Sequence, residues 1–173
     1  DVYTFTSDGE QIYYAADSNG KIFVYQPAEN VVAEVYDTEN YVLTMVYDQG
    51  SLYYYDGYSV NELSLTEPSV PQKISLEEEC ISFNITEDAI YYVQKLPEME
   101  AAGYLDGLME WDDIFDYYVL EEAVDYLGTV WKVSKNGGTP VQVSEDYVSK
   151  LYCSPAGLYY YDTVFGQVFP LEM

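Results

Sequence analysis

The most regular hydrophobic pattern in this chain is an aliphatic residue followed by two tyrosines. It occurs four times, with the aliphatic residue at Ile12, Leu52, Ile90 and Leu158. Each copy follows a short segment rich in Gly, Asp or Glu, and successive copies are separated by 40, 38 and 68 residues. Short alternating runs between turn residues predict β-strands, so the chain reads as a repeated strand unit.

The simplest copy of the unit occupies residues 1–37. Alternating segments at 1–6, 11–16, 21–25 and 31–36 predict four strands. The intervening segments contain Gly, Asn, Asp and Pro, which favour tight turns. The unit therefore resembles an antiparallel four-stranded sheet formed by consecutive hairpins.

The same order of strands recurs along the chain. The second copy predicts strands at 41–47, 52–55, 60–65 and 72–76. The third copy predicts 80–85, 90–95, 129–134 and 140–144, and the fourth predicts 147–152, 158–161 and 167–171. Repeats of about 40–45 residues are typical of β-propeller blades. We therefore predict an all-β, propeller-like array of four four-stranded antiparallel blades in one partial domain, 1–173, with the last blade incomplete.

The fourth copy has three predicted strands. We interpret the chain as a segment of a larger propeller, or as one whose last edge is covered by another element. An uncovered edge strand would invite association with a further strand.

Residues 96–127 interrupt the third copy between its second and third strands. Here the hydrophobic period changes from two to three or four, which predicts helices. Gly103 and Gly107 interrupt the first part, so we expect one short helix and one longer helix. One interpretation is a helical hairpin that covers blade surface, and the other is a lid or a partner-binding surface. The binding candidates of the second interpretation are Trp111, Asp112, Asp113, Asp116 and Glu121.

The composition is strongly acidic, with 31 Asp and Glu against 6 Lys and Arg and a net charge of −25. Such a charge repels phosphate backbones and therefore excludes nucleic acid as a partner. It suits solubility, cation binding or a basic protein partner. No apolar run approaches the roughly 18–20 residues of a membrane span, and we expect any targeting segment to lie outside this sequence.

Catalytic and metal-binding patterns are scarce. The chain has no histidine, so it contains neither a Ser-His-Asp arrangement nor a usual zinc site. We expect no cofactor, with calcium as a weak alternative because Asp17-Ser-Asn-Gly20 resembles the start of a calcium loop. The two cysteines, Cys80 and Cys153, are expected to be free and buried.

Gly128-Thr-Val-Trp-Lys-Val-Ser-Lys-Asn-Gly-Gly-Thr-Pro-Val-Gln-Val143, together with the repeated aliphatic-Tyr-Tyr motif, resembles a known group of repeats. These are the repeats of bacterial secreted or surface propellers of unknown function, related to TolB-like and low-density-lipoprotein-receptor-type propellers. The resemblance covers the chain apart from residues 96–127. It implies an exported propeller, often six-bladed, that binds proteins or ligands on one face, and it carries over no catalytic residue.

These observations favour a non-catalytic binding or scaffolding propeller at the bacterial cell surface, with a protein or small ligand as partner. One alternative is a carbohydrate-active hydrolase or lyase that uses a carboxylate pair. Another is a structural protein that assembles into oligomers through its open last blade.

Overall fold

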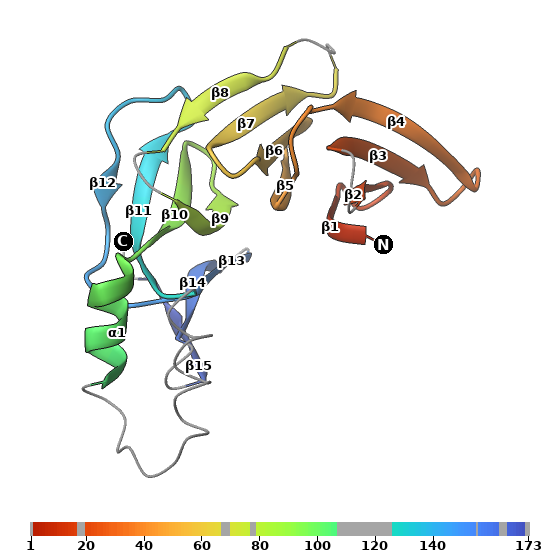
Figure 1. The fold of residues 1–173 in the computed structure, drawn as a ribbon. Helices are drawn as coiled ribbons and strands as arrows, with labels where there is room; N and C mark the ends of the chain where they lie inside the picture. Colours follow the sequence, from red (N-terminus) through yellow and green to blue (C-terminus); the bar gives the residue numbers. More distant parts are fainter. Residues whose placement is uncertain are drawn as a thin grey trace. The chain divides into compact units, whose positions relative to one another are not determined.

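The computed structural model describes residues 2–16, 20–66, 70–76, 79–106, 126–154, 156–162 and 166–171. It divides into two compact units, Asp1–Glu77 and Glu78–Met173. Each unit contains two antiparallel sheets, and within each sheet the strands lie side by side in chain order (Figure 1). The prediction of one domain over 1–173 stays a prediction, and we describe each unit by itself.

The first unit contains sheets 1 and 2. Sheet 1 consists of β1 (Val2–Ser7), β2 (Ile12–Ala16), β3 (Lys21–Gln26) and β4 (Val31–Asp37). Sheet 2 consists of β5 (Thr44–Asp48), β6 (Ser51–Tyr55), β7 (Ser59–Ser64) and β8 (Gln72–Ser75). All neighbouring strands are antiparallel, as the consecutive hairpins in the sequence predict.

The core of the first unit lies between these two sheets. Sheet 1 contributes Tyr13, Ala15, Ile22 and Val24, and sheet 2 contributes Met45, Leu52, Tyr54 and Leu63. The rings of Tyr13 and Tyr47 stack with centroids 5.9 Å apart. The Tyr47 backbone N–H also donates a 3.0 Å hydrogen bond to Thr6 Oγ1, which joins β5 to β1.

Within its described residues, the second unit contains sheets 3 and 4 and one helix. Sheet 3 consists of β9 (Cys80–Ile85), β10 (Ala89–Lys95), β11 (Gly128–Ser134) and β12 (Val141–Gln142). Sheet 4 consists of β13 (Lys150–Ser154), β14 (Gly157–Asp162) and β15 (Gln167–Pro170). The helix α1 (Glu98–Asp106) follows β10.

The core of the second unit lies between sheets 3 and 4 and repeats the arrangement of the first. Sheet 3 contributes Ala89, Tyr91, Val93 and Val130, and sheet 4 with its flanking residues contributes Val148, Leu151, Leu158 and Leu171. The Leu151 N–H donates to Ser82 Oγ at 3.3 Å, and Asn84 Nδ2 donates to the Leu151 carbonyl at 3.5 Å. These contacts join β13 to β9, as Thr6 and Tyr47 join β1 to β5.

Several predicted boundaries differ from the structure, most of all in three strands. Strands β5 and β13 begin at Thr44 and Lys150, three residues later than predicted. The predicted strand 140–144 pairs with its neighbour only at Val141 and Gln142. Pro140 lacks an N–H, and the N–H groups of Val143 and Ser144 both donate to the Val130 carbonyl, so the ladder is irregular on both sides of β12.

Two further predictions are corrected in part. The short helix is present, but it passes through Gly103, since a single glycine weakens a helix by only about 1 kcal/mol; the longer helix would lie outside the described residues. Both cysteines are free, and Cys80 is buried, but Cys153 is exposed. Cys153 pairs with Leu158 next to the β13–β14 turn, where the sheet ends and little covers it.

Candidate functional site

One end of each sheet carries the connection between its second and third strands, and we call it the insertion end. In an antiparallel sheet of consecutive hairpins, the first strand begins and the fourth strand ends at this same end. In sheet 1 this is visible in the pairs Val2–Ala16 and Lys21–Asp37. In sheet 3 the connection is the 96–127 insertion, so this is the end at which the chain departs from its simple repeat.

The insertion end of the first unit exposes large aromatic side chains. Tyr3 is 58% exposed, Tyr41 is 65% exposed and Tyr58 is 75% exposed, and Leu43 accompanies them at 41%. We call these four residues the aromatic rim. Tyrosines exposed this far are available to a partner, because their rings do not contribute to the core.

Three observations place the members of the rim near one another. The Leu43 N–H donates to the Tyr55 carbonyl at 2.9 Å, which holds residues 41–43 against the end of β6. A Cβ at Gly57 would lie 3.7 Å from Leu43 Cδ1, so Leu43 also lies beside the turn that carries Tyr58. Tyr3 and Tyr41 line a common pocket of about 210 Å³ together with Ala16, Val42 and Leu43.

The link from β4 to β5 that carries Tyr41 is held firmly in place. Thr38 donates through both its N–H and its Oγ1 to the Gly20 carbonyl, at 2.8 and 2.6 Å. Any Cβ at Gly20 would collide with the Asn40 carbonyl oxygen, so this close approach requires glycine. The Glu39 N–H donates to Asp37 Oδ1 at 3.2 Å, so the acidic residue of this link lies next to the end of β4, where Asp37 is also 3.7 Å from Lys21 Nζ.

The insertion end of the second unit holds the two ends of the insertion together. The Leu96 N–H donates to the Leu127 carbonyl at 2.9 Å, and both side chains are buried. On α1, Glu100 Oε1 accepts a 3.3 Å hydrogen bond from the Tyr147 hydroxyl. Partial desolvation and the nearby Glu100 carboxylate raise the pKa of Tyr147 above its ordinary value.

The binding residues predicted from the sequence are not placed by the structure. Trp111, Asp112, Asp113, Asp116 and Glu121 all lie outside the described residues. The calcium-like segment Asp17-Ser-Asn-Gly20 is described only at Gly20. Within the described ranges, no three His, Cys, Asp or Glu side chains gather closely enough to hold a metal ion, and no helix there is long and apolar enough to span a membrane.

The sequence interpretation missed the aromatic rim. Tyr3 and Tyr41 lie within the predicted strands 1–6 and 41–47, and the binding candidates predicted from the sequence lie in the 96–127 insertion instead. The available signal was positional, since Tyr3 and Tyr41 stand at the starts of predicted first strands and Tyr58 follows a Gly in a turn. Residues at these positions lie at the sheet end, where no neighbouring sheet covers them.

No protein-family model matches this chain, and no curated protein matches it in sequence. Solved structures do resemble it. A chain of a nidogen/laminin complex has a TM-score of 0.62 at 12% identity, over 96% of this chain and 58% of that one. The computationally designed Ika4 protein has a TM-score of 0.59 at 10% identity, over 98% and 89%.

A streptogramin B lyase structure has a TM-score of 0.59 at 11% identity, over 98% of this chain. This chain spans 54% of the lyase chain, so, as with the nidogen/laminin chain, it matches little more than half of its neighbour's length. The neighbours are β-propeller proteins. At such low identity they show the fold alone, and they confirm the predicted fold class: this chain has the all-β fold of an incomplete β-propeller, and its described residues form four antiparallel sheets and one short helix.

Proposed function

We propose that this protein is a non-catalytic binding module, and that it contacts a basic protein partner through the aromatic rim. The observation that carries the proposal is the exposure of Tyr3, Tyr41 and Tyr58 at one sheet end, beside a rigid acidic link. Tyrosine supplies a large, rigid contact surface at a low cost in conformational entropy. It is also enriched in the residues that dominate binding energy at protein interfaces.

The size of the rim pocket favours a protein partner over a small ligand. At about 210 Å³ it is smaller than the roughly 300–1,000 Å³ of pockets that enclose a drug-sized ligand. It suits a single side chain of a larger partner. A Lys or Arg side chain suits it, because its apolar stem can lie against Tyr3 and Leu43, and its charge would be attracted by Glu39, which stands on the same link as Tyr41.

The charge of the chain supports the same partner class. With a net charge of −25, the protein attracts cationic surfaces and speeds their encounter, and this attraction weakens with salt. The absence of histidine removes the commonest general base, which supports a binding role without turnover. We propose that this binding occurs outside the cell, which is supported by the extracellular domain of a two-component system protein, BT4673 from B. thetaiotaomicron, among the structural neighbours.

An array of cationic, neutral and acidic peptides of equal length tests the proposal. We expect retention of cationic peptides only, with affinity that falls as salt increases. Tyr41→Ser should weaken the best peptide by about tenfold, or ~1.4 kcal/mol. The matched control is Tyr152→Ser, another exposed tyrosine of the same charge that lies outside the rim.

Two results would contradict the proposal. One is equal binding of cationic and neutral peptides, which would remove the charge argument. The other is an equal loss of peptide affinity in the Tyr41→Ser and Tyr152→Ser variants, which would show that the rim is not the binding site. Turnover of an oligosaccharide panel by the wild-type chain would replace the binding role with an enzymatic one.

A further inference from the structure

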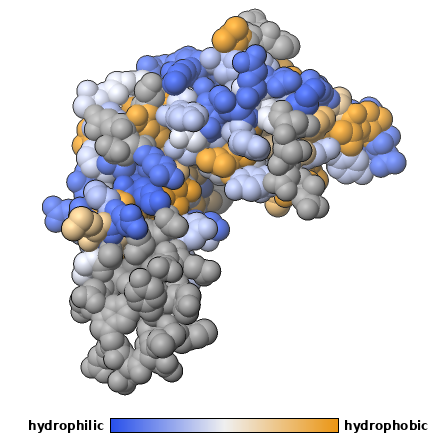
Figure 2. Space-filling model, in the orientation of Figure 1, coloured by the Kyte–Doolittle hydropathy of each residue, from blue (hydrophilic) through white to orange (hydrophobic). Residues whose placement is uncertain are grey.

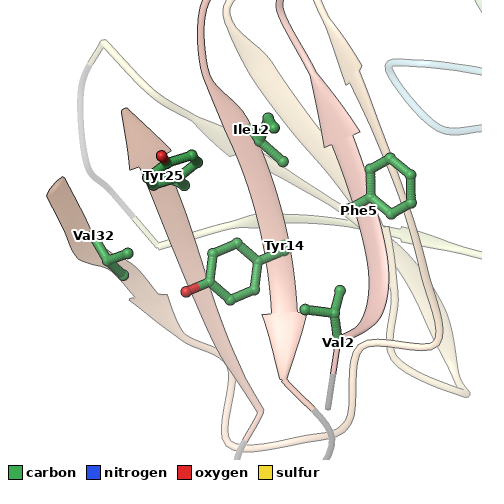
Figure 3. Close-up of a pocket in the computed structure, with 6 residues that line it drawn as sticks. All are labelled: Val2, Phe5, Ile12, Tyr14, Tyr25 and Val32. Carbon is green, nitrogen blue, oxygen red and sulfur yellow. The ribbon is translucent and has the colours of Figure 1, made fainter. Parts of the chain in front are cut away.

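The outer face of sheet 1 is an apolar surface that the proposed binding function does not use. Six of its residues, from all four strands, line a shallow pocket of about 330 Å³ (Figure 3): Val2, Phe5, Ile12, Tyr14, Tyr25 and Val32. Phe5 is 70% exposed and Val32 is 54% exposed. Figure 2 shows hydrophobic side chains gathered over the β3–β4 hairpin at the right of the view. Contiguous exposed apolar surface of this kind marks an interaction site.

The repeat assigns each sheet two distinct faces. We call the face with the aliphatic residue of the aliphatic-Tyr-Tyr motif the front, and the face with the first tyrosine the back. In the first unit, the front of sheet 2 packs on the back of sheet 1. In the second unit, the front of sheet 4 packs on the back of sheet 3. One packing rule therefore operates twice in the molecule.

The open face of sheet 1 is a front face in the same register. In sheet 2, Met45 pairs with Tyr54 and Leu52 pairs with Leu63, and all four residues are buried. Sheet 1 matches them one for one. Its corresponding pairs are Phe5 with Tyr14 and Ile12 with Tyr25. The exposed pocket residues of sheet 1 therefore correspond to residues that are buried in sheet 2. By the packing seen in both units, the back face of another sheet would cover them.

Among the described residues, the back face that stays exposed is the back face of sheet 4. The back faces of sheets 1 and 3 lie in the two cores, and on sheet 2 the back-face residues Tyr53 and Tyr55 are buried. On sheet 4, Val168 is 57% exposed and Tyr152 is also exposed. The pairs Tyr159–Pro170 and Tyr161–Val168 correspond to Tyr13–Val24 and Ala15–Ile22 of sheet 1.

Charge also permits these two faces to meet in spite of the overall acidity. On the front of sheet 1 the carboxylate of Glu34 is 2.7 Å from Lys21 Nζ, which also lies 3.7 Å from Asp37. On sheet 4, Lys150 pairs with Tyr161 and therefore lies on the back face. That face carries a cation, while the described back-face strand residues include no carboxylate.

We propose that a second copy of this chain docks the back face of its sheet 4 on the front face of sheet 1. The contact is heterologous, because different surfaces of the two copies meet. Such contacts close into a ring or extend into a chain of copies, depending on the rotation between copies. Since both copies are strongly acidic, association should strengthen as salt screens their repulsion.

Sedimentation of the full chain with single variants tests the proposal. Wild type should form dimers or larger assemblies as concentration and salt rise. Val32→Lys should weaken association by at least about tenfold, because Val32 lines the pocket. The matched control is Val31→Lys, which changes the neighbouring valine of the same strand, similarly exposed but directed to the other face, and it should associate like wild type. Since both side chains are exposed, both variants should fold, and circular dichroism verifies this.

A mixing experiment separates this contact from other pairings. Val168→Lys alone should associate at least about tenfold more weakly than wild type, as should Val32→Lys alone. Their equimolar mixture should associate again, because one intact front face and one intact back face remain. A wild-type monomer at high concentration and high salt would overturn the proposal. So would unchanged association of Val168→Lys, which would indicate that two sheet 1 faces pair with each other.

Discussion

At the residue scale, glycine is required where two backbone segments approach each other closely, as well as in turns. Gly128 begins β11 directly after the insertion and pairs with Lys95. A Cβ there would collide with the Gln94 carbonyl oxygen and come within 2.6 Å of Val93 Cγ1. Both obstacles belong to the buried central strand β10, which has little freedom to move. Glycine at this position therefore permits the insertion to close onto the sheet.

Replacement of Gly128 by alanine should destabilise the chain by about 2 kcal/mol or more, since overpacking of a rigid core costs roughly 1–3 kcal/mol. Urea denaturation measures the change in the free energy of unfolding. The control is Gly103→Ala within α1, where nothing lies within 4 Å of the added Cβ. That variant should gain about 0.5–1 kcal/mol from better helix propensity. An unfolding midpoint for Gly128→Ala equal to that of wild type would disprove the steric account.

At the element scale, the β5–β6 hairpin shows how well two turn residues suit the backbone conformation that they adopt. The β5–β6 connection has two residues, Gln49 and Gly50, with φ of 45° and 86°. Both values are positive, as a type I′ turn requires. Gly50 suits its position, but Gln49 adopts a left-handed conformation that asparagine adopts more easily.

Gln49→Asn should therefore stabilise the protein by up to about 0.5–1 kcal/mol, and Gly50→Ala should destabilise it by at least as much. Thermal unfolding of the two variants and wild type measures both changes. The side chain at 49 is exposed and a Cβ at 50 meets no atom within 4 Å, so packing contributes little to either. Opposite signs would contradict the turn assignment.

Much of this element structure could be predicted from the sequence, because alternation and turn residues are local signals. The strands β2, β6, β10 and β14 all contain the aliphatic-Tyr-Tyr motif, and each was located to within one residue. The starts of β5 and β13 were misplaced, because residues such as Val42 and Val148 are apolar and buried without belonging to a regular ladder. Exposure of Tyr3, Tyr41 and Tyr58 depends on what covers the sheet ends, which the alternation of apolar and polar residues does not report, although the positions of these residues at strand starts and in a turn point to it.

At the whole-molecule scale, the buried tyrosines make the stability of the folded state depend on pH in the alkaline range. Burial, and after it the nearby Asp8 carboxylate, raises the pKa of Tyr13 to about 12. Burial likewise raises the pKa values of Tyr53 and Tyr54. The folded state thus holds phenol protons that the unfolded state releases near pH 10. The resulting stabilisation is complete below that pH and is lost as pH rises through the folded-state values.

Absorbance titration of tyrosinate should therefore show two phases. One phase should follow the ordinary tyrosine pKa of about 10, and the phase of Tyr13, Tyr53 and Tyr54 should come only at higher pH, together with the loss of β-sheet circular dichroism. In urea the two phases should merge into one. A single native-state transition near pH 10 with the sheet signal intact would show that the buried phenols are not desolvated.

The most direct test of the central claim maps partner binding on the molecule itself. A ¹⁵N-labelled chain would be titrated with the tightest cationic peptide from the array, and backbone amide shifts recorded by NMR. The account predicts that the largest shifts occur at Tyr3, Tyr41, Leu43 and Tyr58, with Tyr152 and Val168 unaffected. Shifts spread evenly over acidic residues, or centred on another surface with the rim unchanged, would contradict the claim that the aromatic rim is the binding site.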